Sequence, residues 1–516
     1  MPNSAVELQT QPSSRVAETL QHRLLVFVPF LLLFWINQAH HTLFFDEVNA
    51  WAISAASPNL RTLFHLVHYE GHPWLWYFIL WFPSRLTHDP AAMKWVEAAL
   101  GTAVLGVVGM LSPFTSGQRV LIFLGYFLLW EYTVMNRMYS VMFLLALIYA
   151  WRRAHTNRGL AVNAGLLGLM ANTDVTGLLL STALLLEYAY TTFRSARNDR
   201  DLHEWLRHWS VGAGCYLFFV AVSVYTLFPA PDISWQSSGK PGTEALGRHH
   251  ILRSVGNVIA GPWWPINPQF PHRFWETDVS WQPLLYLLVP VILFAYWRTF
   301  RKQPSLVLLM SLTILFAAGF ADVVYIGRVR HWGITFIAFL LGLWWQSQRA
   351  PSSAWSPWAY GLLTLSAIAG VTTIASSWHH PFSNARTAAK WVEQNQSPGT
   401  RLIGAPDVSF ASLAEEMQRP VYFMECRCVS TFKLFSRNGE DFGESEWPAR
   451  ILQAMDDLHT DQLIFVTYRP LNQRDLTGFG QAGLASTGIA AFPGADMKTE
   501  NYFLYNIRQT GAAPQT

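Results

Sequence analysis

Charged residues are scarce in this chain. Only 13% of its 516 residues are Asp, Glu, Lys or Arg, whereas 51% are hydrophobic and 15% are aromatic. Soluble proteins average roughly 25% charged residues, so the composition argues against an ordinary soluble enzyme. The formal net charge of +3, without a clustered basic face, also argues against a nucleic-acid partner.

Cysteine and the common nucleotide-binding motifs are scarce or missing too. Three cysteines are too few for a disulfide framework. The C-x-C formed by Cys426 and Cys428 fits neither the usual zinc knuckle nor an easy disulfide, and we expect both residues to be structural bystanders. The sequence has no P-loop, dinucleotide fingerprint or G-x-S-x-G motif, which argues against ATP-driven or cytosolic cofactor chemistry.

Long apolar runs are what the sequence has instead. Residues 377–516 hold 27 of the 69 charged residues, so the chain divides into an apolar body and a polar C-terminal part. A membrane-spanning helix needs about 20 mostly apolar residues. We therefore predict a polytopic α-helical membrane protein with about eleven spans. The predicted spans are residues 24–40, 93–111, 119–136, 138–151, 159–172, 175–191, 209–228, 282–297, 304–322, 332–346 and 355–376.

One further apolar segment, residues 72–82, is short and rich in Trp, Tyr and Phe. Such aromatics favour the headgroup level, so we predict an interfacial or re-entrant helix within an outer loop, residues 41–92. Every short inner loop then carries Arg or Lys, as the positive-inside rule requires. The tail 1–23 is predicted to be cytoplasmic, and the long loop 229–281 and residues 377–516 to lie outside.

The exported C-terminal part alternates strand-like and helix-like patterns. TRLIGA, PVYFM, DQLIFVTY and YFLYNI resemble short buried strands, and RTAAKWVEQN, ASLAEEMQ and ARILQAMDDL resemble amphipathic helices. The pattern predicts a small extracytoplasmic α/β domain over residues 377–516. Glu415–Glu416 and Asp456–Asp457 are predicted to be solvated helix faces.

Two acidic groups stand near the predicted outer membrane surface. Asp46 and Glu47 follow the first span within about six residues, and carboxylates so close to a membrane often mark function; an acidic helix cap is the alternative. Glu70 and His72 begin the aromatic helix at the same depth. They could serve as general base, metal ligands or acceptor clamps, or could simply suit a helix N-terminus.

Basic groups lie on the same predicted side. Arg137 stands in a turn between two apolar segments, where an Arg either reaches to lipid phosphate or binds a phosphorylated ligand. A second cluster, Arg328, Arg330 and His331, breaks the positive-inside pattern, and an anionic ligand would explain it. The weaker candidates are Asp174, His249 and His250.

These elements together resemble a known family. An acidic pair after the first span, the stretch EGHPWLWYF, the turn YTVMNRMYS and an outer C-terminal domain resemble the GT-C membrane glycosyltransferases. The chain looks most like bacterial relatives of protein O-mannosyltransferases and lipid A aminoarabinose transferases. The resemblance covers chiefly residues 24–155. The chain departs from the family in having only Pro73 of the family's double proline, with Trp74 in place of the second, and in placing Arg137–Met138 where an acid often stands.

The resemblance implies a catalytic domain over residues 24–376 in a bacterial inner membrane, with a periplasmic C-terminal domain. It implies transfer of a sugar from a polyprenyl phosphate in the outer leaflet to a lipid, glycan or protein acceptor. A divalent metal is possible but not required. Asp46 would be the base or acceptor-orienting carboxylate. The implied site residues are Asp46 and Glu47 as catalytic, Glu70 and His72 near the acceptor or a metal, and Arg137, Arg328, Arg330 and His331 at the donor phosphate.

Two other classes remain open. A transporter or flippase of lipid-linked sugars would use a similar membrane body, but such proteins often show duplicated halves with broken helices, and we find no duplication here. A membrane scaffold could use the outer domain to bind a partner. Carboxylates and guanidinium groups on one face favour the enzyme.

Overall fold

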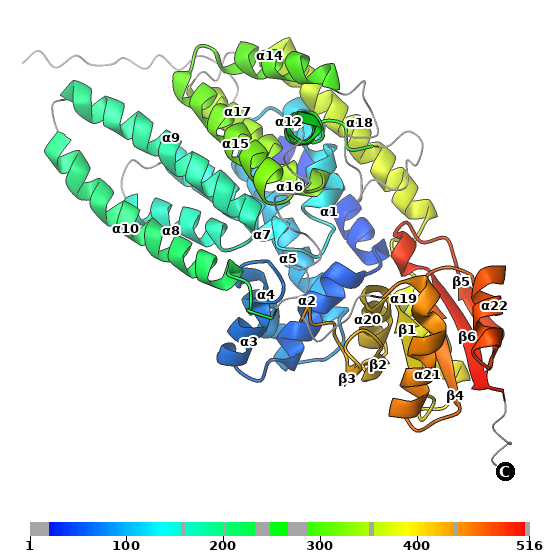
Figure 1. Cartoon of the computed structure of the whole chain (residues 1–516). Helices are drawn as coiled ribbons and strands as arrows, with labels where there is room; N and C mark the ends of the chain where they lie inside the picture. The colour runs from blue at the N-terminus through cyan, green and yellow to red at the C-terminus, as the bar shows by residue number, and fades with distance from the viewer. Residues whose placement is uncertain are drawn as a thin grey trace, which may run out of the picture.

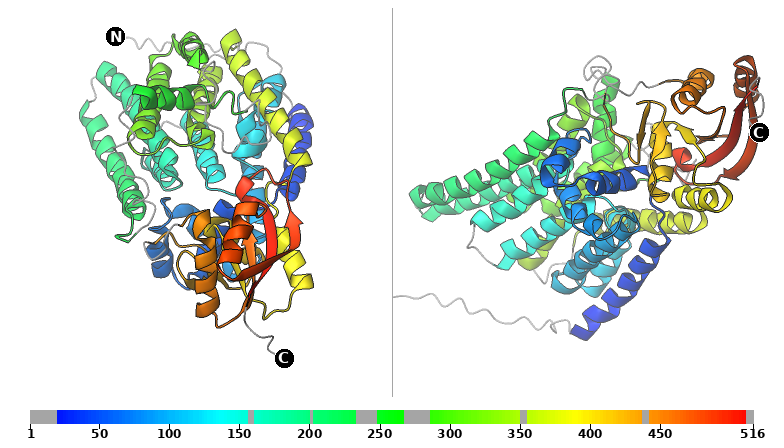
Figure 2. Two further views of the ribbon diagram at one scale, coloured as in Figure 1. Left: turned by 45° about the vertical axis from the view of Figure 1, so that its right-hand side comes forward. Right: turned by 90° about the horizontal axis from the view of Figure 1, so that it is seen from below.

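The structure, a computed structural model, describes residues 20–155, 160–199, 202–232, 248–266, 286–349, 355–436 and 442–510. Most of the chain is helical, and a six-stranded sheet domain follows at its C-terminal end (Figure 1). Figure 2 shows this sheet domain against one flank of the helical body, while the α9–α10 pair extends away from it. Most of the predicted cytoplasmic tail, 1–23, lies outside the described residues.

Within the described residues, five helices are long and apolar enough to cross a membrane. They are α1 (Leu20–His40), α5 with the π-helical turn that continues it (Ala92–Leu111), α10 (Leu202–Leu227), α15 (Pro304–Val323) and α18 (Pro357–His379). Other helices at predicted spans fall below that criterion of length and composition. They are α6 (Ser116–Phe123), α7 (Tyr139–His155), α8 (Leu160–Ala171), α9 (Val175–Asp199), α14 (Leu288–Phe300) and α17 (Ile334–Arg349).

The predicted span 119–136 is not one continuous helix. Helix α6 ends at Phe123, a π-helical turn covers Phe127–Glu131, and turns follow to residue 138. Helix α18 packs against the break so closely that a Cβ on Gly370 would lie 2.1 Å from the Leu124 carbonyl oxygen. Hydropathy predicted one span over this segment and could not predict the break, which depends on the contact with α18.

Residues 41–92, predicted to be the first outer loop, form three short helices, α2 (Phe45–Ala56), α3 (Leu60–Val67) and α4 (Leu75–Trp81). Helix α4 confirms a short aromatic helix within 72–82, and a 3₁₀ turn at Pro83–Arg85 ends it. The 229–281 loop contains α12 (Arg248–Ile259), and the turn before α17 contains α16 (Val329–Trp332). Helices α2, α3 and α4 lie at the end of the helical body near the sheet domain (Figure 1), whereas α12 packs against α14, α15 and α16 within the body.

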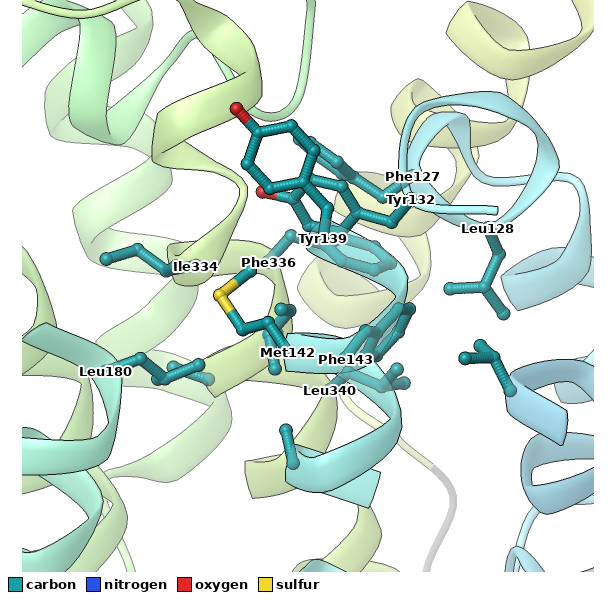
Figure 3. Packing of buried hydrophobic residues seen from close by; sticks show 14 of the residues in the cluster. Phe127, Leu128, Tyr132, Tyr139, Met142, Phe143, Leu180, Ile334, Phe336 and Leu340 are labelled. Carbon is teal, nitrogen blue, oxygen red and sulfur yellow. The ribbon is translucent and has the colours of Figure 1, made fainter. Parts of the chain in front are cut away.

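Aromatic packing holds the turn between α6 and α7. The ring of Tyr132 stacks on that of Tyr139 with centroids 5.1 Å apart, and Phe127 packs against Phe336 of α17 at 5.2 Å. Figure 3 shows these rings above the side chains of Met142 and Phe143, all inside the body. Because interiors are close-packed, this cluster fixes the position of the neighbouring Arg137.

The C-terminal domain confirms the predicted small α/β fold. The strands lie in the order β3-β2-β1-β4-β6-β5; β1 is parallel to β2 and β4, and the other pairs are antiparallel. Helices α19 and α20 cover one face and α21 and α22 the other. The elements are β1 (Leu402–Ala405), β2 (Val421–Phe423), β3 (Cys428–Ser430), β4 (Gln462–Thr467), β5 (Leu484–Phe492), β6 (Tyr502–Gln509), α19 (Ala385–Asn395), α20 (Asp407–Glu416), α21 (Trp447–Asp457) and α22 (Gln473–Gln481).

The strands β3 and β5 and the helix α22 were not predicted. Strand β5 is an edge strand of mostly small residues, LASTGIAAF, and therefore lacks the apolar alternation that signals a half-buried strand. Strand β3 has only three residues. Both strands pair with strands that were predicted, β2 and β6. Their strand conformation therefore follows from pairing in the sheet rather than from a pattern in their own sequences.

Two predictions for this domain are corrected. Cys426 and Cys428 form a disulfide, because the turn between β2 and β3 brings their Cα atoms to 5.2 Å, within the usual range. Glu415 and Glu416 are not solvated: Glu415 is 5% exposed and the Glu416 side chain 4%, because α20 packs against α2. Asp456–Asp457 is exposed, as predicted.

The buried Glu415 makes stability depend on pH. Burial, and then the charge of Glu416, raises the pKa of Glu415 from 4.5 to about 8. The folded protein therefore keeps a proton that the unfolded chain loses near pH 4.5, and stability falls as pH rises from about 5 to about 8. We expect Glu415→Gln to raise stability at pH 8 by on the order of 3 kcal/mol and by little at pH 5, measured as melting temperature in detergent. An equal effect at both pH values would contradict this.

Candidate functional site

Glu47 closes the start of helix α2. The chain leaves α1 at His40, crosses residues 41–44 in extended form and enters α2 at Phe45. The Glu47 carboxylate accepts hydrogen bonds from the backbone N–H groups of Phe44 (3.1 Å) and Asn136 (2.6 Å). Both of its oxygens also lie 2.9 Å from Nε2 of His41. The first turn of α2 is thereby fixed to the turn before α7.

Burial changes the role expected of Glu47. Its side chain is fully buried, as is that of His41, so it is enclosed by protein rather than facing a substrate. The sequence predicts Glu47 as a second catalytic carboxylate. The geometry instead gives it the task of holding the backbone next to Asp46, which was the alternative of an acidic helix cap.

Asp46, one residue earlier, points elsewhere. Its side chain is 30% exposed, and Oδ2 lies 3.8 Å from Nη2 of Arg330. The Nη1 group of Arg137 donates a hydrogen bond to the Asp46 backbone carbonyl. Two guanidinium groups that are far from Asp46 in sequence thus meet it at one place, as the sequence predicts for Arg137 and Arg330.

His72 joins this group through a chain of hydrogen bonds. Nη2 of Arg137 lies 3.1 Å from Nε2 of His72, and Nδ1 of His72 lies 3.2 Å from Oδ1 of Asp174. A guanidinium can only donate, so Nε2 is the acceptor and Nδ1 carries the proton toward Asp174. Burial is the largest influence and alone would raise the pKa of Asp174, but the interactions with His72 and the hydrogen bond from Thr176, among others, together outweigh it and lower that pKa. Asp174, a weaker candidate from the sequence, therefore belongs to the network as an ionised carboxylate.

Glu70 lies beside the same cluster of side chains, but its carboxyl group differs from that of Asp174 in proton affinity. Its oxygens accept hydrogen bonds from the Asn49 amide (3.2 Å) and the Tyr77 hydroxyl (3.1 Å). Burial raises the pKa of Glu70 to about 7 in spite of those bonds. Glu70 can therefore take up or release a proton near neutral pH, which suits a group that handles an acceptor hydroxyl.

The second basic cluster is only partly cationic. Nδ1 of His331 accepts the backbone N–H of Arg328 at 2.9 Å. Burial and the charge of Arg330 hold the pKa of His331 well below its usual range, so its imidazole is neutral and would offer a hydrogen bond rather than a charge. His249 and His250 begin α12, and their side chains lie outside the described part of the chain.

Several polar residues near the site were not predicted. Among the described residues, the buried hydroxyl of Tyr139 has no hydrogen-bond partner, and neither has the buried Nε of Arg137, a residue that the sequence did predict. Tyr139 lies within electrostatic range of Asp174, Arg330 and Arg137. Glu131, which binds the Tyr126 hydroxyl at 2.6 Å, also faces Arg330. An acid inside the apolar run 119–136 was the signal that could have revealed Glu131.

A cavity of about 910 Å³ lies at the other end of the helical body. Its lining includes Arg153, Tyr188, Trp205, Trp345 and Arg349. Fourteen residues of α7 separate Tyr139 from Arg153, which is about 20 Å along a helix. As for metals, no group of three or more His, Cys, Asp and Glu side chains that could hold an ion occurs within the described ranges.

No protein-family model matches this chain, and no curated protein matches it. The function must therefore be argued from the site itself.

The two neighbouring acids should respond differently to substitution. Glu47→Ala leaves buried donors on Asn136 and Phe44 without an acceptor, and we expect a loss of about 3 kcal/mol or more. Asp46→Ala removes a partly exposed carboxylate and should cost less than about 1 kcal/mol. Melting temperatures of the two purified variants in detergent would show this, and equal losses would contradict the assignment.

Proposed function

We propose that this protein is an integral membrane glycosyltransferase of the GT-C type. It transfers a sugar from a polyprenyl phosphate to an envelope or secreted acceptor at the outer face of a bacterial inner membrane. The observation that carries the proposal is the partly open carboxylate of Asp46, 3.8 Å from Arg330 and fixed through its backbone by Arg137. Sugar transfer from a lipid phosphate requires these two charges side by side.

Each group has a step to perform. The acceptor oxygen attacks the anomeric carbon of the sugar, and its proton passes to the Asp46 carboxylate. As that bond forms, the bond from the anomeric carbon to the phosphate oxygen breaks on the opposite face, with inversion. The polyprenyl phosphate leaves with the bonding electron pair, and the guanidinium groups of Arg137 and Arg330 stabilise its charge. Glu70 and His72 lie where they can orient the acceptor.

Unsatisfied polar atoms support an anionic ligand at this place. A buried donor without a partner costs about 1–3 kcal/mol. The Tyr139 hydroxyl and Arg137 Nε are two such donors in the described chain, near the guanidinium of Arg330. A phosphate group placed between Arg137 and Arg330 would give both donors an acceptor. Arg328 and His331 adjoin the same turn and could bind the rest of the headgroup.

The proposal includes eleven spans, with the N-terminus inside and the C-terminal domain outside. Helix polarity supports it: α7 begins beside Arg137 and ends in Arg152 and Arg153, and α17 begins beside Arg330 and ends in Arg349. Basic residues thus gather at the end of the body opposite to Asp46, which the positive-inside rule assigns to the cytoplasm.

The catalytic assignment can be tested with isosteric variants. We expect Asp46→Asn to lower sugar transfer by 100-fold or more, and Arg330→Gln by about 100-fold, because each removes a charge used in the transition state. The assay uses membranes carrying each variant and sugar-loaded polyprenyl phosphate extracted from the host. Asp456→Asn, an exposed acid in the outer domain, is the matched control. Unchanged transfer in Asp46→Asn would overturn the proposal.

A transporter of lipid-linked sugars is the second candidate. The cavity lined by Arg153 and Arg349 favours it, because alternating access opens a path to the side of the membrane opposite to Asp46 as well. The same variants separate the two functions. In a transporter they would slow the movement of the sugar lipid between leaflets, and purified protein would form no glycosidic product even with the native sequence.

The topology has its own test. In a chain carrying Cys215→Ala, we expect Asp456→Cys to react with a membrane-impermeant maleimide in spheroplasts, because the outer domain is exposed. Arg301→Cys, at the end of α14, should react only after the membrane is opened. Labelling of both in intact spheroplasts, or of neither, would contradict the proposed orientation.

A further inference from the structure

A carboxylate of the C-terminal domain reaches the helix that carries Asp46. Glu500 lies just before β6 and is fully buried. Its Oε1 accepts a hydrogen bond of 3.0 Å from the backbone N–H of Phe45, which is 455 residues away in sequence. Phe45 is the first residue of α2 and directly precedes Asp46. The outer domain therefore holds the backbone next to the proposed catalytic group.

Glu500 is held rigidly while it does so. Oε1 also accepts the hydroxyl of Ser412 (2.9 Å), and Oε2 accepts those of Ser383 and Tyr502 (2.8 Å each). Four donors thus surround the two oxygens. A buried carboxylate is tolerated only when its hydrogen bonds are satisfied, so the pocket around Glu500 is built to keep this acceptor at one position.

The first N–H groups of a helix have no acceptor within the helix. In α2 the N–H groups of Glu47 and Val48 bond to the carbonyl of Phe44, whereas the N–H of Phe45 bonds to Glu500. A negative group at this end also complements the helix dipole. Without Glu500, the N–H of Phe45, in the peptide unit between Phe44 and Phe45, would lose this acceptor from the C-terminal domain.

A second contact fixes the segment before α2 to the same domain. The backbone N–H of Ser383 donates to Oγ1 of Thr42 at 2.8 Å. The ring of Phe382 packs against those of His41 and Phe44, with centroids 5.4 and 5.0 Å apart. Residues 41–45 are thereby clamped between the helical body and the outer domain.

We propose that Glu500 is a positioning residue for Asp46, so that the outer domain forms part of the catalytic machinery. This inference rests on the proposed glycosyltransferase function. Glu500 touches neither donor nor acceptor; it binds the backbone N–H of Phe45, while Arg137 binds the backbone carbonyl of Asp46. Together they set the direction in which the Asp46 carboxylate points toward Arg330.

Two substitutions of Glu500 should lower the rate of transfer to different extents. Glu500→Ala removes every acceptor, whereas Glu500→Gln keeps one oxygen that can still accept from Phe45, with its amide group donating to the Ser383 and Tyr502 hydroxyls. We expect kcat to fall by 10-fold or more in Glu500→Ala, with KM for extracted sugar-loaded polyprenyl phosphate changed less than about threefold. Glu500→Gln should restore most of kcat.

Hydrogen exchange supplies a readout that needs no substrate. In full-length protein in detergent, we expect Glu500→Ala to speed exchange of the peptide covering residues 42–48 by 10-fold or more. Strands β1 and β4 should keep their protection. Glu393→Ala, an exposed acid of α19, is the matched control. Tyr502→Phe removes a bond to Glu500 inside the domain and should leave residues 42–48 protected.

The outcomes are distinct. The proposal is overturned if Glu500→Ala leaves both kcat and exchange at 42–48 unchanged, or if Tyr502→Phe lowers kcat as much as Glu500→Ala does. Should Glu500→Ala unfold the domain, Glu500→Gln decides instead: retained kcat with protected residues 42–48 supports positioning, and lost kcat with protected residues overturns it. Normal transfer by Asp46→Asn would contradict only the proposed glycosyltransferase function. The exchange of residues 42–48 is measured without sugar transfer and tests the contact with Glu500 separately.

Discussion

The candidate site depends on how the first turn of α2 is anchored. Three groups from distant parts of the chain fix it: Glu47 binds the turn at Asn136, Arg137 binds the Asp46 carbonyl, and Glu500 binds the Phe45 N–H. Anchored backbone keeps a side chain within the small tolerance that catalysis needs. The exposed carboxylate of Asp46 is therefore the end of a rigid assembly.

The charges around this assembly are unequal in their access to water. Glu47 and Asp174 are buried, whereas Asp46 and, to a lesser degree, Arg330 are partly exposed. Electrostatic interactions strengthen as water is excluded, so buried pairs hold the geometry. The partly open pair between Asp46 and Arg330, 3.8 Å apart, is loose enough to be separated by a ligand that satisfies both.

The C-terminal domain contributes to more than one side of the site. Besides Glu500, the backbone N–H of Lys433 donates to Oδ1 of Asn49, whose amide group donates to Glu70. Lys433 is in turn ion-paired with Glu425 beside the disulfide. The segment after β3 therefore supports Glu70, while the segment before β6 supports Asp46. The C-terminal domain thus contacts residues 41–92 at two separate points.

The local sequence was enough to predict the helical, apolar character of the body and the small α/β domain, and to single out Asp46, Arg137 and Arg330 as candidate site residues. Hydropathy, periodicity and charge are properties of short segments. Tertiary structure decided which of two adjacent acids is open: successive side chains turn by about 100° on a helix, and only the contacts with His41 and Asn136 show that Glu47 is the enclosed one. The break near Gly125, the buried Glu415 and the reach of Glu500 likewise follow from packing between segments far apart in the chain, which no local pattern records.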